Sequence, residues 1–168
     1  SYSQISKPGV EFRQETITSI DPVTRQVTTQ NGTYVADVLV VALGADYNIG
    51  ATPGLAEGGH EFYSFEGAER VRDILPSFKK GHAIVGVCSF PFKCPPAPSE
   101  TALLLHDYLV RQGVRKDCKI SLIVPFELPL PPSYGTSKAL LKSFQEKDIN
   151  YIPEMMVGSI DAINKGAE

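Results

Sequence analysis

The first 45 residues alternate between apolar and polar positions in short runs, which is the periodicity of β-strands. Asp21-Pro22 interrupts this part of the chain, and Asn31-Gly32 is a strong signal for a two-residue hairpin turn. We therefore predict a flanking antiparallel β layer. Its expected strands are Val10–Arg13, Thr16–Ile20 and Arg25–Thr29.

A longer apolar run follows, from Thr33 to Leu43. Its second half, Asp37 to Gly44, is almost continuously apolar, which is typical of a strand buried on both faces of a parallel sheet. The next segment, from Ala45 to Gly59, is rich in glycine and proline and predicts a loop, with Pro53-Gly54 as its turn.

From Ser64 onward the apolar spacing becomes helical, with Ser64 as the expected N-cap and Pro76 as the expected end of the helix. The order β-α-β-α-β between residues 82 and 152 predicts an α/β fold with a Rossmann-like parallel sheet. The expected elements are a strand at His82–Val87, a helix from Pro98 to Gly113, a strand at Lys119–Val124, a helix at Thr136–Lys147 and strands at Asn150–Ile152 and Val157–Ile163.

The composition is that of an ordinary folded protein, with 42% hydrophobic and 21% charged residues. A net charge of −3 gives no reason to expect a nucleic acid partner. No apolar run approaches the roughly 20 residues of a membrane-spanning helix. The three cysteines fit neither a disulfide framework nor a zinc pattern, so no metal site is expected.

A cysteine stands in a proline-rich loop just ahead of the helix that begins near Pro98. A helix N-terminus and a neighbouring cation, here Lys93, both favour the reactive thiolate form of a thiol such as Cys94. Glu100, in the first helical turn, is then a candidate proton relay. An equally open alternative is that Cys94 is a small buried apolar residue and Glu100 only favours the helix dipole. Cys88 and Cys118 are expected to be structural, because each lies at the end of an apolar strand.

The strand before this loop lacks the glycines of a dinucleotide-binding fingerprint. Only Gly86 could serve, and the bulky Phe90 and Phe92 occupy the following positions. The pattern therefore predicts a degenerate nucleotide-binding domain that does not bind NAD(H) tightly.

With these residues in view, the chain resembles the sulfide:quinone oxidoreductase and flavocytochrome c sulfide dehydrogenase branch of the FAD-dependent pyridine nucleotide-disulfide oxidoreductases. The resemblance covers nearly the whole chain. It is carried by Asp37–Ala45 and by the loop Phe92-Lys93-Cys94-Pro95-Pro96-Ala97-Pro98-Ser99-Glu100. It implies that residues 1–60 belong to the FAD-binding domain and residues 61–168 to a degenerate NAD(P)-binding-like α/β domain.

The resemblance also implies roles for individual residues. Cys94 would be one member of a redox pair that oxidises sulfide or another small sulfur species, and Glu100 would be the acid/base residue. FAD would carry two electrons to a quinone or cytochrome acceptor. The residues implied to contact the cofactor are Ala42, Leu43, Gly44, Ala45, Lys93 and Pro95.

Several features depart from that family. Ser99 replaces an expected aromatic residue, Phe62–Phe65 contains no additional cysteine, and no histidine follows Val124. The chain also lacks the N-terminal glycine fingerprint and a late segment with the second redox cysteine. We therefore expect an internal fragment of a longer enzyme, which by itself holds no FAD and is inactive.

Such a full-length enzyme is expected to be membrane-peripheral or periplasmic, with any membrane association made through parts outside this chain. Two alternatives remain open at this stage. One is an NADH:acceptor flavoprotein like the type II NADH dehydrogenases. The other is a non-catalytic binding domain with a Rossmann-like shape.

Overall fold

The structure is a computed structural model that describes residues 8–164 and 166–167. The chain divides into two compact units, residues 1–45 and 46–168. This division falls earlier than the domain boundary expected after residue 60. The assignment of the two parts to FAD-binding and NAD(P)-binding-like domains stays a prediction.

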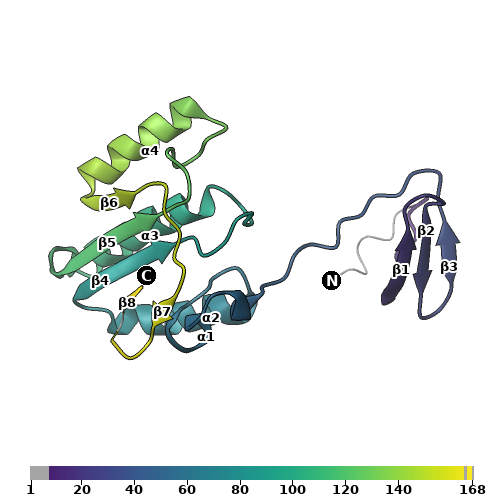
Figure 1. Ribbon diagram of the computed structural model, residues 1–168, viewed down its shortest axis with the longest axis horizontal. Helices are drawn as coiled ribbons and strands as arrows, with labels where there is room; N and C mark the ends of the chain where they lie inside the picture. Colours follow the sequence, from purple (N-terminus) through teal and green to yellow (C-terminus); the bar gives the residue numbers. More distant parts are fainter. Residues whose placement is uncertain (1–7, 165, 168) are drawn as a thin grey trace. The chain divides into compact units, whose positions relative to one another are not determined.

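The first unit contains a three-stranded antiparallel sheet (Figure 1). The Asp21 carboxylate accepts hydrogen bonds from the N–H groups of Val23 and Thr24, which closes the turn between the first two strands. The antiparallel layer and its two turns are thus confirmed. The expected strand at Val10–Arg13 is wrong, because these residues have no strand partner in the described chain. The strands are β1 (Ile17–Asp21), β2 (Gln26–Thr29) and β3 (Thr33–Val35).

The apolar run after β3 is not a buried strand, which corrects the prediction from the sequence. β3 ends at Val35, and residues 37–44 form no strand. Val38 and Val40 are 77% and 80% exposed. A strand buried on both faces needs parallel neighbours, and within the described residues no strand pairs with this segment.

A three-stranded parallel sheet forms the centre of the second unit, as the sequence predicted. Its strands are β4 (Gly81–Gly86), β5 (Cys118–Ile123) and β6 (Ile149–Ile152), connected by α3 (Ala97–Arg111) and α4 (Tyr134–Glu146). Figure 1 shows both helices packed along the sheet. The side chains between helices and sheet are fully buried, among them Ala102, Leu109, Ile120, Leu122 and Phe144.

The helix before β4 begins and ends where the sequence predicted. In α2 (Phe65–Ile74), the Ser64 hydroxyl accepts a hydrogen bond from the Gly67 N–H at 2.9 Å, which is a side-chain N-cap. The helix tightens into the 3₁₀ turn η3 (Leu75–Ser77), which contains Pro76. The helix α3 also ends as predicted. Gly113, just after its C-terminal end, has a φ of +73°, as expected for the residue that terminates a helix.

The segment 46–60 packs against the C-terminal hairpin of the second unit. It contains η2 (Ile49–Ala51) and α1 (Leu55–Gly58), and the hairpin pairs β7 (Ile160–Asp161) with β8 (Gly166–Ala167). The predicted Pro53-Gly54 turn is confirmed, with Gly54 at φ +77°. Only glycine fits, because a Cβ there would lie 1.8 Å from the Ile160 carbonyl oxygen. The strand predicted at Val157–Ile163 is longer than the observed β7.

Arg115, in the 3₁₀ turn η4 (Arg115–Asp117), ties α3, β5 and the end of α4 together. Its Nε donates to the His106 Nδ1 of α3 at 2.9 Å. One terminal nitrogen donates to the Cys118 carbonyl at 2.6 Å, and the other donates to the carbonyls of Lys147 and Asp148 at 2.7 and 2.6 Å. The Arg115 side chain is 13% exposed, and its hydrogen bonds to His106, Cys118 and Lys147 are partly buried.

His106 makes the stability of the chain sensitive to acid. Burial and the positive charges of Arg115 and Lys147 lower the pKa of His106. Between this value and the ordinary histidine pKa of about 6.5, the unfolded chain binds more protons than the folded chain. The His106 contribution is therefore complete above about pH 6.5 and is lost as the pH falls through the folded-state pKa.

We predict that the free energy of unfolding decreases more steeply below about pH 6.5 in the parent chain than in His106→Gln, whose amide oxygen can still accept from Arg115. Urea unfolding at several pH values between 5 and 8 measures both slopes. Equal slopes would show that another group causes the acid sensitivity.

Candidate functional site

The candidate site is the loop that leaves the carboxyl end of β4 and enters α3. Cys94 lies in this loop and is exposed. Its φ of +54° places a non-glycine residue in the left-handed region, which costs about 1 kcal/mol or more. The Cys94 carbonyl accepts a hydrogen bond from the Ala97 N–H at 2.9 Å, so the loop backbone runs directly into the first turn of the helix.

A cluster of aromatic side chains holds the residue before the cysteine. The Tyr63 hydroxyl donates to the Lys93 carbonyl at 2.6 Å. The Lys93 ammonium lies over two rings, 5.1 Å from the centroid of Tyr47 and 5.4 Å from that of Tyr63. The two rings meet edge to face at 6.0 Å. We call these three residues, Tyr47, Tyr63 and Lys93, the aromatic clamp.

Glu61 fixes the segment from which Tyr63 projects. Its carboxylate accepts from the N–H groups of Tyr63 and Ser64, both at 3.0 Å. Burial opposes ionisation of Glu61, but hydrogen bonds from Ser64 and Tyr63 outweigh it and lower the pKa of Glu61. Burial and the Glu61 charge raise the pKa of Tyr47 to about 12, so this phenol is neutral at physiological pH.

The pKa of the Tyr63 phenol lies above its ordinary value. Burial raises the pKa of Tyr63, and the charge of the Cys94 thiolate raises it further. Burial raises the pKa of the other two thiols, Cys88 and Cys118, which disfavours their reactive form.

Glu100 lies in the first turn of α3 with an exposed side chain, and its N–H donates to the Pro96 carbonyl. The structure thus places Cys94 and Glu100 on the same loop-to-helix junction. Ser99, which precedes Glu100, is only 2% exposed and packs into the unit.

The same junction is poorly equipped to bind the pyrophosphate of a dinucleotide. A Cβ at Gly86 would lie 2.5 Å from the Val157 side chain, so Val157 fills the space above the only available glycine. Pro98 in the first turn of α3 has no N–H, and the Ala97 N–H already donates to Cys94. Few free donors remain for an anion at this helix end.

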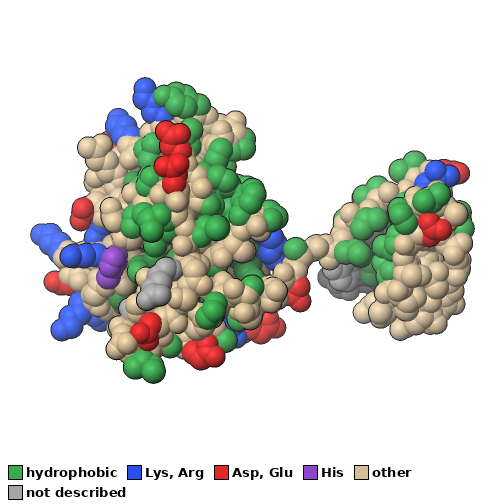
Figure 2. Space-filling model, in the orientation of Figure 1, with side chains coloured by type: hydrophobic (Ala, Val, Ile, Leu, Met, Phe, Trp, Pro, Cys, Tyr) green, Lys and Arg blue, Asp and Glu red, His purple; other side chains and the backbone are tan. Residues whose placement is uncertain are grey.

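The other residues predicted to contact a cofactor, Ala42 to Ala45, belong to the first unit, whereas Lys93, Cys94 and Pro95 belong to the second. Gly44 has a φ of +75°, and no atom lies within 4 Å of the position of a Cβ there. The backbone at Gly44 is therefore not covered by other described residues. Figure 2 shows hydrophobic side chains exposed on both units.

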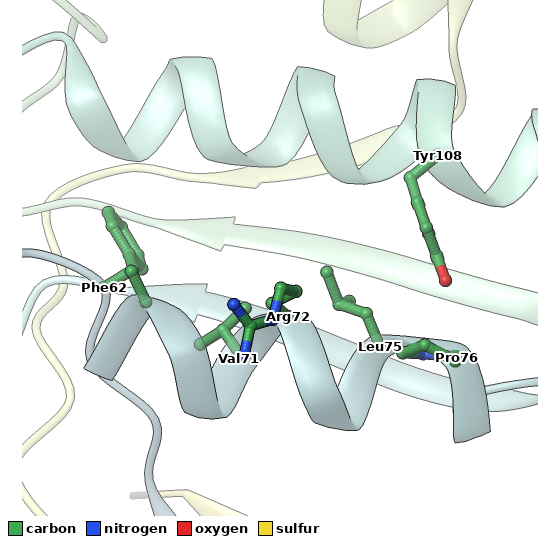
Figure 3. Close-up of a pocket in the computed structure, with 7 residues that line it drawn as sticks. Phe62, Val71, Arg72, Leu75, Pro76 and Tyr108 are labelled. Carbon is green, nitrogen blue, oxygen red and sulfur yellow. The ribbon is translucent and has the colours of Figure 1, made fainter. Parts of the chain in front are cut away.

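An apolar groove of about 470 Å³ lies between α2 and α3 (Figure 3). Its walls include Phe62, Val71, Leu75 and Tyr108, and none of the predicted site residues lines it. The one charged wall residue, Arg72, is paired with acidic neighbours on its own helix. The groove and the cysteine loop therefore share no residues.

Sequence reasoning missed the aromatic clamp, because Tyr47 and Tyr63 are far from Cys94 along the chain. The only signal was the concentration of aromatic residues between positions 47 and 65. Within residues 8–164 and 166–167, no cluster of acidic, histidine or cysteine side chains could hold a metal ion. In the same part of the chain, no helix is long and apolar enough to cross a membrane.

Comparison with curated proteins finds two relatives whose names contain sulfide and quinone. The chain is 29% identical over 165 residues to the sulfide-quinone reductase of Aquifex aeolicus, which covers 94% of this chain and 38% of the relative. It is 29% identical over 119 residues to the mitochondrial sulfide:quinone oxidoreductase of Dictyostelium discoideum, covering 67% of this chain and 26% of the relative. No family model matches the chain.

Comparison with solved structures also finds a sulfide:quinone oxidoreductase. The sulfide:quinone oxidoreductase of Aquifex aeolicus matches 94% of this chain and 40% of its own, with a TM-score of 0.67 and 25% identity. The type II NADH dehydrogenase of Plasmodium falciparum, at 18% identity and a TM-score of 0.59, shares the fold. The predicted resemblance and the α/β fold class are confirmed. The chain spans less than half of each of these proteins.

Proposed function

We propose that this chain is part of an FAD-dependent oxidoreductase that oxidises sulfide or a related small sulfur species through Cys94. The acceptor of the two electrons would be a quinone or a cytochrome. The observation that carries the proposal is the Cys94 loop, in which an exposed thiol takes the place of a phosphate-binding glycine loop at the end of β4. The similarity to two proteins named for sulfide and quinone supports it.

In the proposed reaction Cys94 is joined by a disulfide to the second redox cysteine of the full-length enzyme. Hydrosulfide attacks the partner sulfur, the S–S bond breaks, a persulfide forms on the partner and Cys94 leaves as a thiolate. FAD, when bound, supplies a two-electron acceptor for this thiol chemistry. Ala42 to Ala45, Lys93 and Pro95 would contact it.

Glu100 is the proposed acid/base residue of this site. Its exposed carboxylate in the first turn of α3 can exchange protons with solvent and with an incoming sulfur species. The proposed location of the full-length enzyme is the periphery of a membrane or the periplasm. One of the two relatives is named mitochondrial.

An NADH:acceptor flavoprotein is the second candidate, because the type II NADH dehydrogenase shares the fold. Val157 above Gly86 and the prolines at the start of α3 argue against it, since they remove the space and the donors that a dinucleotide needs.

Anaerobic reduction of the flavin in the full-length protein tests the proposed function. We predict that sulfide bleaches the flavin absorbance near 450 nm within seconds, whereas NADH at the same concentration reduces it at least about 100-fold more slowly. A mixture of both reductants serves as a control for inhibition. Rapid reduction by NADH alone would favour the NADH:acceptor enzyme, and no reduction by either would favour a non-catalytic domain.

A further inference from the structure

We infer that Tyr63 is a positioning residue for the Cys94 thiol, and that it acts by holding the Lys93 carbonyl and the Lys93 ammonium at the same time. This inference deepens the proposed function and rests on it in one respect, namely that Cys94 is the reacting thiol. The contacts themselves are independent of any reaction.

The two peptide carbonyls on either side of the Cys94 backbone are both fixed. Tyr63 donates to the Lys93 carbonyl at 2.6 Å, and the Ala97 N–H donates to the Cys94 carbonyl at 2.9 Å. A non-glycine residue keeps a left-handed conformation only when its surroundings determine it. These two hydrogen bonds provide that determination for Cys94 at φ +54°.

The side chain of Lys93 adds a second attachment at the same point. Its ammonium lies over the faces of Tyr47 and Tyr63, at distances where a cation and a ring attract each other. Tyr63 therefore contacts Lys93 through both its hydroxyl and its ring. Loss of the hydroxyl removes one attachment, and loss of the ring removes both.

Tyr63 is itself held from the other side, so the clamp is connected to a rigid base. Its N–H donates to Glu61, its ring stacks on Phe62 at 5.2 Å, and α2 begins immediately after it with the Ser64 cap. The helix α2 and the cysteine loop are thereby linked across 30 residues of sequence.

Site-specific trypsin cleavage after Lys93 measures this link without any cofactor. Trypsin needs an extended backbone and a free lysine side chain, and the clamp restrains both. We expect Tyr63→Phe to raise the rate of cleavage between Lys93 and Cys94 about 5- to 10-fold, the equivalent of one lost hydrogen bond. Tyr134→Phe is the matched control, because Tyr134 is 71% exposed at the start of α4.

Conservative replacement separates positioning from general stability. Lys93→Arg keeps a cation that stacks on rings and keeps a trypsin site, so we expect cleavage at the parental rate. The rate of trypsin cleavage after Lys93 should be higher in Tyr63→Leu than in Tyr63→Phe, because leucine lacks both the hydroxyl and the ring. A Tyr63→Phe cleavage rate equal to that of the parent, with the chain folded by circular dichroism, would overturn the inference.

A spectroscopic signal tests whether Tyr63 senses the sulfur. Alkylation of Cys94 with iodoacetamide should change the ¹³Cζ chemical shift of Tyr63, assigned by its absence in Tyr63→Phe, and leave that of Tyr134 unchanged. An unchanged Tyr63 signal would contradict the inference.

In the full-length protein, Tyr63→Phe should lower kcat for sulfide about 5- to 10-fold with little change in KM. If Cys94→Ser remains fully active, the proposed function fails, whereas the cleavage and chemical-shift results still decide the role of Tyr63.

Discussion

Replacing Cys94 with serine in the full-length protein is expected to lower the rate of flavin reduction by sulfide about a thousandfold or more. The hydroxyl of serine cannot form a disulfide and cannot leave as a stable anion at neutral pH, so the proposed exchange step has no substitute. Cys94 is exposed, and the change from sulfur to oxygen leaves the backbone contacts of the loop intact. The loss should therefore appear in the rate of reduction rather than in stability.

Cys88→Ser provides the matched control in the same protein. Cys88 lies at the end of β4, and burial raises the pKa of its thiol. We expect its replacement to leave the rate within about twofold, since a thiol held in the neutral form is a poor nucleophile. Stopped-flow absorbance measures both variants. A Cys94→Ser protein as fast as the parent would refute the assignment of Cys94, and a large loss in Cys88→Ser would identify Cys88 as its redox partner.

Local sequence signals predicted the second unit well because its elements depend on nearby residues. Ser64 caps α2 with its own hydroxyl, Pro76 marks the change to a 3₁₀ turn, and Gly113 takes the left-handed conformation that ends α3. The strands β4 and β5 have enough apolar residues to be recognised by composition alone. For the helix cap and the helix ends, the interaction that determines the structure lies within a few residues of the signal.

The sequence was misleading where the determining contact is distant. Residues 37–44 have the composition of a buried parallel strand, yet most of them are exposed and no described strand pairs with them, because strand formation needs neighbours that composition does not specify. The aromatic clamp was missed for the same reason, since Tyr63 and Lys93 are 30 residues apart. The cysteine loop itself was visible in the sequence, but the residues that hold its backbone were not.

Arg115→Ala is expected to lower the free energy of unfolding by about 3 kcal/mol. The guanidinium donates to His106 and to the carbonyls of Cys118, Lys147 and Asp148, and no other side chain can replace this planar set of donors. Alanine would leave acceptors without partners, three of them partly buried. The ion pair with Asp148 contributes little, because that carboxylate is fully exposed and 4.0 Å away.

Two further variants, Arg111→Ala and Arg115→Lys, determine whether Arg115 stabilises the chain through its hydrogen bonds or through its charge. Arg111→Ala, at the exposed end of α3, controls for loss of one positive charge and should change the free energy of unfolding by less than about 0.5 kcal/mol. Arg115→Lys keeps the charge but not the fork of donors, so it should recover less than half of the loss. Urea unfolding followed by circular dichroism measures all three. If Arg115→Ala were no less stable than Arg111→Ala, the contacts between α3, β5 and the end of α4 would be held by apolar packing alone.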